Sequence, residues 1–331
     1  MTEPLRWGLL STAHINRKLI PAIRDNPRAE LISVASRSQS RASRYAAEWS
    51  IPRAHGTYEA LLEDPDVDVV YVSLPNSLHA EWTVKALEFG KHVLCEKPLA
   101  LSVAECNQII EASQANGVVA MEAVMYLYHP ILHKAREMVR DGAVGEITMV
   151  RGSFSFLLDR PDDVRWDPTL GGGALWDIGS YPVSFIRWIV GEPDRVSGWQ
   201  TLSSSGVDAT FAGMLRYDGE MLGVFDCSFL EPFRSKAEVA GRKGRLVIEH
   251  PYPVSEETRL LLYDRDGDTA EEVAVAKKED AYHSEVEALT AAVLDGASLA
   301  VPLTSSRANV ATLNALYESA RQGEPEPVLD V

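Results

Sequence analysis

Lys97 is the first side chain in the sequence that suggests a chemical role. It follows an apolar run of strand length in the segment KHVLCEKP, residues 91–98, where Glu96 and Pro98 flank it. Ligands of open α/β sheets bind outside the carboxyl ends of the strands, so a lysine placed there can reach a bound substrate. Pro98 restricts the backbone directly after the lysine, and a cis bond is one way to do so. The alternative is a solvated charge pair of Glu96 and Lys97 at the end of a strand.

Two further segments carry residue types suited to a dinucleotide. The turn after the first predicted strand reads Ser11-Thr12-Ala13-His14-Ile15-Asn16 where a G-x-G-x-x-G pattern would stand, so all three glycines are replaced. Small residues remain where the backbone must approach a pyrophosphate, and Ser11 or Thr12 could donate to phosphate oxygens. An ordinary turn is the alternative.

The second predicted strand ends in Ser36-Arg37-Ser38. NAD enzymes usually carry an acidic residue at this position, whereas an arginine flanked by hydroxyls suits a 2′-phosphate. We therefore expect NADP as the cofactor, with NAD as the less favoured one. A surface arginine without a ligand is the alternative.

Strand and helix patterns alternate along the first 120 residues. Ser102 and Glu105 stand at capping-box spacing before one helix, and Gly117 ends it. Alternation at this spacing predicts a parallel, doubly wound sheet. The predicted strands are 5–10, 31–35, 67–74, 92–95 and 118–121, and the predicted helices are 15–24, 40–49, 58–62, 79–89 and 102–116.

After residue 122 the pattern changes to long alternating segments. Tyr217-Asp218-Gly219-Glu220 and Arg242-Lys243-Gly244 are typical of hairpin turns. The fold class is therefore α/β: a Rossmann doubly wound parallel sheet in residues 1–122, then an α+β domain with a large open, mostly antiparallel sheet in residues 123–331. We expect the ligand in the cleft between the domains. Predicted strands here are 147–157, 208–217, 220–229, 236–240, 246–249 and 260–263, and predicted helices are 130–141, part of 171–188, 282–294 and 305–322.

Composition narrows the range of partners. The 331 residues include 48 acidic and 32 basic side chains, a net charge of −16 without a basic patch, which disfavours nucleic acid and anionic lipid. No apolar run approaches the ~20 residues of a membrane span, and the amino terminus lacks a signal-peptide pattern, so we expect a cytoplasmic protein. Cys95, Cys106 and Cys227 have no C-x-x-C spacing and are interpreted as buried apolar residues. His129 and His133 have no acidic ligand nearby, so no metal is expected.

Motifs in both halves point to one family. Residues 5–130 contain WGLLSTAHIN, VASRS, YEALLEDPDVDVVYVSLPNSLHAEWTVKALEFGKHVLCEKPLA and MEAVMYLYHP. The second half contains GGGALWDIGSYPVSFIRWIVG at 171–191 and GRKGRLVIE at 241–249. Over nearly its full length the chain resembles the glucose-fructose oxidoreductase, inositol dehydrogenase and rhizopine catabolism (Gfo/Idh/MocA) family. The E-K-P motif together with D-x-G-x-Y at 177–181 is more specific than either alone.

The resemblance implies an NAD(P)-dependent sugar or polyol oxidoreductase whose open-faced sheet makes oligomer contacts. It assigns the family's lysine to Lys97, its acid to Asp177, and its histidine or tyrosine to Tyr181. With a tyrosine at this position, the chain resembles the dihydrodiol dehydrogenase, NADP-linked D-xylose dehydrogenase and sugar ketoreductase branches of the family. Hydride transfer requires a hydroxyl proton to be removed or supplied, which Tyr181 can do. Lys97 could favour its phenolate and bind the same oxygen.

Alternatives remain for these assignments. Asp177 precedes Tyr181 by four residues, so on a helix both would face one side, and Asp177 could orient a sugar hydroxyl or Lys97. Tyr181 could equally be a core aromatic residue, and Asp177 an acid that starts a helix. Arg165 and Trp166 could bind sugar hydroxyls and stack on a sugar face, or pack a loop. Tyr126 is similarly ambiguous.

The loop after the predicted strand 67–74 completes the expected site. Leu74-Pro75-Asn76-Ser77-Leu78-His79 matches the family's segment over the nicotinamide-side ribose, although Asn76 could be an ordinary turn residue. The expected cofactor residues are Ser11, Thr12, Ala13, His14, Ile15, Ser36, Arg37, Ser38, Leu74, Pro75, Asn76, His79, Glu96 and Lys97. The expected substrate residues are Lys97, Tyr126, Arg165, Trp166, Asp177 and Tyr181, of which Lys97, Tyr181 and Asp177 are expected to be catalytic.

The favoured function is NADP(H)-dependent hydride transfer between nicotinamide and a carbon of an aldose such as a pentose or hexose. A nucleotide-linked keto-sugar reductase and a trans-dihydrodiol dehydrogenase are rivals within the family, and Leu127, where related sugar dehydrogenases often carry arginine, keeps them open. A non-catalytic NADP-sensing regulator is the alternative from another class, although the presence of Lys97, Asp177 and Tyr181 together argues against it. Expected partners are a sugar or polyol and further copies of the chain, as dimer or tetramer, with no nucleic acid and no membrane.

Overall fold

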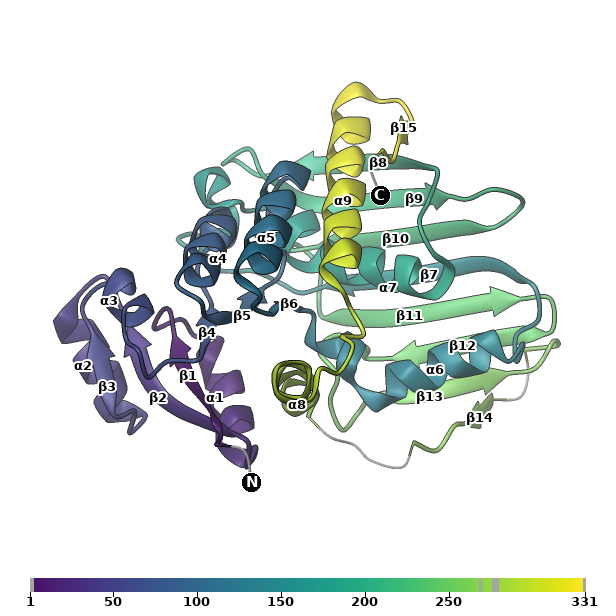
Figure 1. Cartoon of the computed structure of the whole chain (residues 1–331). Coiled ribbons are helices and arrows are strands. Elements are labelled where there is room, and N and C mark those ends of the chain that lie inside the picture. Colours follow the sequence, from purple (N-terminus) through teal and green to yellow (C-terminus); the bar gives the residue numbers. More distant parts are fainter. Residues whose placement is uncertain (1–2, 268–269, 276–279, 330–331) are drawn as a thin grey trace. The chain divides into compact units, whose positions relative to one another are not determined.

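The chain forms two compact units (Figure 1). The structure, a computed structural model, describes residues 3–267, 270–275 and 280–329. The first unit runs to Met125 and also takes in Ala281–Ser306, and the second holds Tyr126–Asp280 and the residues from Arg307 onward. Each unit contains its own sheet.

The first unit is built on a six-stranded parallel sheet with the order β3-β2-β1-β4-β5-β6. Strand β4, with the sequence VVYV, is buried at every position, as expected in a parallel sheet covered on both faces. The strand order reverses between β1 and β4, which is the switch point where doubly wound folds bind ligands. The predicted parallel, doubly wound sheet is confirmed. The strands are β1 Leu5–Leu9, β2 Ala29–Ala35, β3 Arg53–His55, β4 Val69–Val72, β5 His92–Glu96 and β6 Ala120–Ala123.

Helices connect these strands, and α5 begins and ends as the sequence predicts. Ser102 Oγ accepts a hydrogen bond from Glu105 N at 3.2 Å, and the Glu105 carboxylate accepts one from Ser102 N at 3.0 Å. Gly117 follows with a φ of 64°, a left-handed conformation that favours glycine. The helices are α1 Asn16–Asp25, α2 Gln39–Glu48, α3 Tyr58–Leu62, α4 His79–Glu88 and α5 Val103–Asn116.

Helix α8, Ala281–Asp295, differs from the predicted division, which placed every residue after 122 in the second domain. The helix packs beside α1 in the first unit, where Glu287 and Asp295 pair with Arg28 at 2.5 and 2.6 Å. An apolar helical pattern predicts a buried face but does not say which sheet that face covers. The return of the chain to the first unit was therefore not predictable from periodicity.

The second unit is built on a nine-stranded sheet with the order β14-β13-β12-β11-β7-β10-β9-β8-β15. Among the described strands of this sheet, only β7 and β10 pair in parallel, so the mostly antiparallel sheet is confirmed. Both predicted hairpins form, between β9 and β10 and between β11 and β12. The strands are β7 Ile147–Ser155, β8 Arg195–Leu202, β9 Asp208–Arg216, β10 Leu222–Ser228, β11 Arg234–Gly241, β12 Gly244–Glu249, β13 Arg259–Tyr263, β14 Ala270–Glu272 and β15 Glu326–Pro327.

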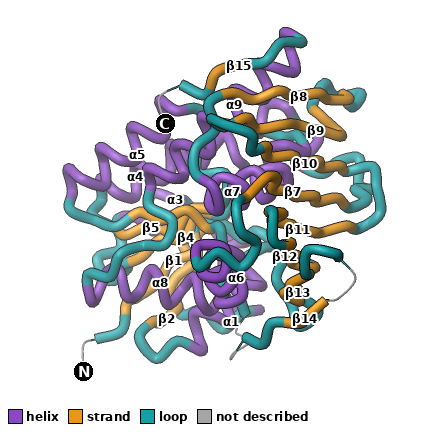
Figure 2. Tube along the Cα trace, turned by 90° about the vertical axis from the view of Figure 1, so that its right-hand side faces the viewer, coloured by secondary structure: helices purple, strands orange, loops and turns teal. Residues whose placement is uncertain are grey.

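One face of this sheet is covered by helices. A Cβ atom on Gly198 of β8 would lie 2.7 Å from Leu316 O, and one on Gly152 of β7 would lie 2.5 Å from Pro182 Cβ. The helices α7 and α9 therefore lie against the same face, and Figure 2 shows the strands from β8 to β14 following one another beside them. Gly198 interrupts the apolar alternation of β8, which explains why this strand was not predicted. The helices are α6 Pro130–Arg140, α7 Ser180–Val190 and α9 Leu303–Gln322.

No helix among the described residues is long and apolar enough to cross a membrane. Cys95, Cys106 and Cys227 are all buried, as predicted.

Candidate active site

The turn after β1 contains no glycine, and a buried network of side-chain hydrogen bonds holds it. Ser11 Oγ lies 2.8 Å from Ser73 Oγ, and Ser73 Oγ donates to Asn16 Oδ1 at 2.7 Å. Asn16 is fully buried, and its Nδ2 donates to Ser11 O at 2.8 Å. The Ser11 hydroxyl also accepts from Ala13 N at 3.0 Å. The Ser11 hydroxyl therefore has a structural role in holding this turn against Ser73, and its expected phosphate contact stays a prediction.

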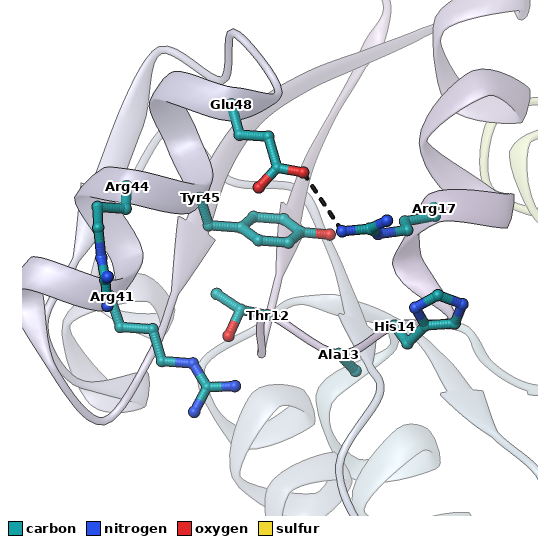
Figure 3. Close-up of a pocket in the computed structure, with 8 residues that line it drawn as sticks. All are labelled: Thr12, Ala13, His14, Arg17, Arg41, Arg44, Tyr45 and Glu48. Atoms are coloured by element: carbon teal, nitrogen blue, oxygen red, sulfur yellow. Dashed lines mark hydrogen bonds and ion pairs between the residues drawn. The ribbon is translucent and has the colours of Figure 1, made fainter.

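A pocket of about 470 Å³ lies beside this turn (Figure 3). Three arginines and one carboxylate line it, and Arg17 pairs with Glu48 across it at 3.4 Å. The excess of positive charge suits an anionic ligand next to a helix start. The lining residues are Thr12, Ala13, His14, Arg17, Arg41, Arg44, Tyr45 and Glu48.

The sequence analysis named Thr12, Ala13 and His14 of this pocket but missed its arginines. Arg41 and Arg44 recur with helical spacing on one face of α2, the helix that follows the predicted 2′-phosphate segment. That spacing was the available signal. Figure 3 shows the Arg41 guanidinium on the same side of the Tyr45 ring as Thr12.

Arg37 is exposed at the start of α2. It is not among the side chains that line the pocket, but it and Arg41 both act electrostatically on Tyr58. Burial raises the pKa of the Tyr58 phenol, and the two positive charges oppose this shift. Ser36 is buried, whereas Arg37 and Ser38 are both exposed, so these two members of the predicted segment are accessible to an anion.

Lys97 lies half-buried in a turn after β5 that two glutamates hold in place. The Tyr71 hydroxyl donates to Glu96 Oε1, and Glu122 Oε1 accepts from Leu99 N at 2.9 Å. Burial and the Glu96 charge raise the pKa of Tyr71, so its hydroxyl stays protonated as a donor. Glu96, which was expected to contact the cofactor, is thus hydrogen-bonded to Tyr71 of the neighbouring strand β4. The backbone next to Lys97 is fixed on both sides.

His79, which was expected to contact the cofactor, also holds this turn. The side chain is fully buried, with Nδ1 2.7 Å from Pro98 O and Nε2 2.8 Å from Leu74 O. Because both ring nitrogens face backbone carbonyls, no ligand can reach them. The Lys97–Pro98 peptide bond is cis. Pro75 and Asn76 of the same loop are half-buried and remain candidates for ligand contact.

In the second unit, two expected site residues form an ion pair. The Arg165 side chain donates through Nε to Asp177 Oδ2 and through Nη1 to Asp163 Oδ1 at 3.1 Å. The charge of Asp177 raises the pKa of Arg165 further, so the guanidinium stays charged. The side chain of Asp177 is only 13% exposed, and this pairing compensates its partial burial.

Asp177 lies in a π-helical turn, Leu175–Gly179, that directly precedes α7. Asp208 anchors the start of this turn by accepting from Leu175 N at 2.7 Å and from the Tyr317 hydroxyl at 2.7 Å. Gly173 has a φ of 122°, and a Cβ atom there would lie 2.2 Å from Asp208 Oδ1. The glycine run thus permits a close approach to a buried carboxylate. Asp208 opens a strand 35 residues after Gly173 and carries no sequence signal of this role.

Tyr181 lies in a cluster of four aromatic rings at the start of α7. The ring centroids of Tyr126, Phe154 and Tyr252 lie 5.5, 5.4 and 5.6 Å from its own. Tyr181 is 7% exposed, whereas Tyr126 is fully buried, with its hydroxyl donating to Tyr181 O at 3.0 Å. Tyr126 thus supports Tyr181 from within the core, and its expected contact with substrate stays a prediction.

Trp166 follows Arg165 but faces a different environment. Its ring packs edge-on against Phe229, with centroids 5.3 Å apart, and lines a pocket of about 610 Å³. Asp162, Asp167 and the serines 203–205 also line this pocket. Asp163, which accepts from Arg165, lines the same pocket.

The two histidines considered for a metal have other roles. His129 Nδ1 accepts from Ile131 N at 3.2 Å before α6, and His133 packs against Trp188 at right angles. Within residues 3–267, 270–275 and 280–329, no three histidine, cysteine or acidic side chains gather where they could hold a metal ion.

The fold and these residues define a class of protein. A doubly wound sheet with a basic pocket at its first turn suits a dinucleotide, and a lysine, a carboxylate and a phenol suit proton and hydride chemistry. Residues 5–124 match the oxidoreductase family with an NAD-binding Rossmann fold, and residues 132–247 match the GFO/IDH/MocA C-terminal domain. The chain belongs to the GFO/IDH/MocA family of oxidoreductases.

The matches with similar proteins extend over most of the chain or nearly all of it. D-xylose 1-dehydrogenase (NADP(+)) 2 from Haloferax volcanii is 39% identical over 323 residues, 96% of this chain and 98% of that protein. A trans-1,2-dihydrobenzene-1,2-diol dehydrogenase from Mus musculus is 33% identical over 250 residues, 74% of each chain. Among solved structures, a 3-ketoreductase from Actinomadura kijaniata in complex with NADP and TDP-benzene has a TM-score of 0.89 at 28% identity, covering 96% of this chain and 98% of that one.

Proposed function

We propose that this protein is an NADP(H)-dependent oxidoreductase that transfers a hydride between nicotinamide and a carbon of a sugar, an aldose such as a pentose or hexose. The basic pocket beside the first turn is the observation that carries the cofactor assignment. The similarity to an NADP-linked D-xylose dehydrogenase, which extends over nearly the whole chain, supports the substrate class. The rivals are a nucleotide-linked keto-sugar reductase and a trans-dihydrodiol dehydrogenase.

The residues around the first turn fit NADP. Arg41 and Arg44 line the pocket, and Arg37, which shortly precedes Arg41 in the sequence, is exposed. No acidic residue occupies the segment 36–38. Guanidinium groups bind phosphate through several N–H donors at once. We therefore assign the 2′-phosphate to these arginines and the dinucleotide backbone to Thr12, Ala13 and His14. When bound, the cofactor accepts or supplies the hydride.

The chain's own residues would manage the proton. Oxidation of a carbon that bears a hydroxyl breaks its C–H bond and releases the hydroxyl proton, which we assign to the Tyr181 oxygen. Lys97 would donate a hydrogen bond to the same substrate oxygen and favour the phenolate of Tyr181. Asp177, neutralised by Arg165, would accept from a neighbouring sugar hydroxyl. In the reverse direction the phenol returns the proton.

A substrate panel tests this function. We expect NADPH absorbance to appear when the protein and NADP⁺ are mixed with pentoses or hexoses, with D-xylose included. Turnover only of trans-dihydrodiols, or only of nucleotide-linked keto-sugars in the reverse direction, would favour a rival. Tight NADP binding without turnover of any compound in either direction would indicate a regulator instead.

Arg37→Asp should lower the affinity for NADP about 10–100-fold relative to NAD, because it replaces charge-assisted hydrogen bonds by repulsion of the 2′-phosphate. Titrations of both cofactors, followed by protein fluorescence, measure the ratio. Arg41→Ala should lower it in the same direction. The exposed Arg140 of α6 provides the control, since Arg140→Asp should leave the ratio unchanged. Equal loss of NADP and NAD affinity would show that Arg37 does not read the 2′-phosphate.

We further propose that the face of the second sheet opposite α7 and α9 joins copies of this chain. Cross-strand register places Met214, Val224, Arg151 and Glu238 in one row, and Arg151 pairs with Glu238 across the strands. Trp199 in the adjacent row is 62% exposed. Apolar side chains beside internally paired charges suit a self-complementary interface despite the net charge of −16.

Trp199→Lys and Val224→Lys should each convert the expected dimer or tetramer to monomer, because they place an unpaired charge on this face of the sheet. Analytical ultracentrifugation measures the state. Phe89→Lys, at an exposed apolar residue at the end of α4, is the matched control and should leave it unchanged. A monomeric parent protein would overturn the proposal.

A further inference from the structure

The helix that carries Asp177 and Tyr181 begins without a capping side chain of its own. It starts directly after Gly173, runs through the π-helical turn Leu175–Gly179 and continues as α7. Its first turn is closed by the bond from Asp177 N to Gly173 O, which is 3.1 Å long. The N–H groups of residues 174–176 precede this bond, so, as at any helix start, they need partners from outside the helix.

Two residues that are distant in sequence supply these partners. Asp208, the first residue of β9, accepts from Leu175 N at 2.7 Å, and its carboxylate also interacts with the Ala174 N–H. The Tyr317 hydroxyl, from α9, donates to Asp208 at 2.7 Å, and its oxygen interacts with the backbone of Trp176. A carboxylate and a phenol thus do together what a serine, threonine, aspartate or asparagine usually does from the position before a helix.

Gly173 explains why this cap comes from outside the helix. Its φ is 122°, and a Cβ atom there would lie 2.9 Å from the Tyr317 oxygen and closer still to Asp208 Oδ1. The Asp208 carboxylate therefore fills the space that a side chain at the cap position would need. The Tyr317 ring adds a further contact, since its centroid lies 5.5 Å from that of Trp176 in the π-helical turn.

The cap is buried, so its donors and acceptors depend on one another. Burial raises the pKa of Asp208, and the hydrogen bonds from Tyr317 and Leu175 oppose this shift. Burial and the Asp208 charge raise the pKa of Tyr317, so its hydroxyl stays protonated as a donor. Removal of either side chain would leave polar groups at the helix start without their partner.

We propose that Asp208 and Tyr317 are positioning residues that cap this helix from β9 and α9 and thereby hold Asp177 and Tyr181 in the geometry that the reaction needs. The inference rests on the proposed function, which assigns a sugar hydroxyl to Asp177 and the proton to Tyr181. Asp177 lies within the π-helical turn and Tyr181 follows it by four residues, so a shift of the helix start moves both. A displacement of about 1 Å can lower a rate about 100-fold.

Three variants test the cap. Asp208→Ala removes the acceptor of Leu175 N and the partner of Tyr317, so kcat should fall about 10–100-fold. Asp208→Asn keeps an oxygen for Leu175 N and presents an amide to the Tyr317 oxygen, so kcat should recover to within about fivefold of the parent value. Tyr317→Phe keeps the ring against Trp176 but removes the hydroxyl, so kcat should fall about 3–10-fold. The NADP Kd should not change, because the arginines assigned to NADP lie in the first unit.

Ser319→Ala is the matched control on the same helix. Ser319 is buried two residues after Tyr317, and its hydroxyl accepts from Gly198 N at 3.1 Å and donates to Glu324 O at 2.6 Å. Its loss should lower Tm, as the loss of the Tyr317 hydroxyl does, but leave kcat unchanged. The experiment measures kcat, the KM for sugar, the NADP Kd and Tm. Losses of kcat in Asp208→Ala and Tyr317→Phe no greater than in Ser319→Ala, or an Asn variant as impaired as the Ala variant, would overturn the inference.

Amide hydrogen exchange separates the inference from the proposed function. The amides of residues 174–177 should exchange faster in Asp208→Ala than in the parent protein and in Ser319→Ala. If the parent protein turns over no sugar, the proposed function fails, and exchange then decides about the cap. A selective increase in Asp208→Ala would support it, whereas equal exchange in Asp208→Ala and Ser319→Ala would refute it.

Discussion

Lys97→Met is expected to lower kcat about 10²–10⁴-fold while NADP still binds. Methionine keeps most of the apolar stem of lysine but removes the ammonium group, which the proposed mechanism assigns to the substrate oxygen and to the Tyr181 phenolate. The turn itself should survive. Glu96, Leu99 and the Pro98 carbonyl each hold it through contacts of their own.

Steady-state rates with the best sugar of the panel measure this loss, and fluorescence titration measures NADP binding in the same variant. Lys85→Met is the control, because Lys85 forms a surface ion pair with Glu81 on α4. We expect no change in that variant. Unchanged turnover in Lys97→Met would remove Lys97 from the reaction, whereas loss of NADP binding alone would make it a cofactor residue.

Tyr181→Phe should lower kcat about 10²–10⁴-fold, because phenylalanine cannot accept or supply the hydroxyl proton. The fold should persist, since the ring contacts with Tyr126, Phe154 and Tyr252 involve carbon atoms that phenylalanine retains. The neighbouring ring supplies a matched control. The Tyr252 hydroxyl donates to Lys236 O at 3.3 Å, and burial raises its pKa, so it serves packing rather than proton transfer.

Tyr252→Phe should therefore leave kcat unchanged and lower the free energy of unfolding by about 1 kcal/mol. Comparison of the two variants by steady-state kinetics and urea unfolding separates chemistry from packing within one aromatic cluster. If both variants lose activity equally, the cluster as a whole matters and Tyr181 has no special role. If neither does, another group transfers the proton.

The alternating pattern made the first sheet predictable, and turn residues did the same for the hairpins of the second. Strand β3 has three residues and β8 contains Gly198, so neither gives a clear period. Residue type indicated which positions are polar but not the direction in which a side chain points. We therefore expected His79 and Tyr126 to contact ligands, although both side chains are buried in the core.

The basic pocket shows a different limit. Its arginines lie on one helical face of α2, which a periodicity argument could have found, but helical charges are normally read as a solvated surface. The anchor between Gly173 and Asp208 gave no such signal, since its two ends are far apart in sequence and neither is distinctive alone. Contacts set by tertiary folding, rather than by local pattern, account for what the sequence could not indicate.

The placement of α8 has a consequence for how the chain is made. On the ribosome, residues to Met125 emerge first, and the helix that packs beside α1 and pairs with Arg28 emerges only after the whole segment Tyr126–Asp280. The surface of the first unit that α8 covers therefore stays uncovered until most of the second unit has been synthesised. The first unit can be completed only then, although each unit has a sheet of its own.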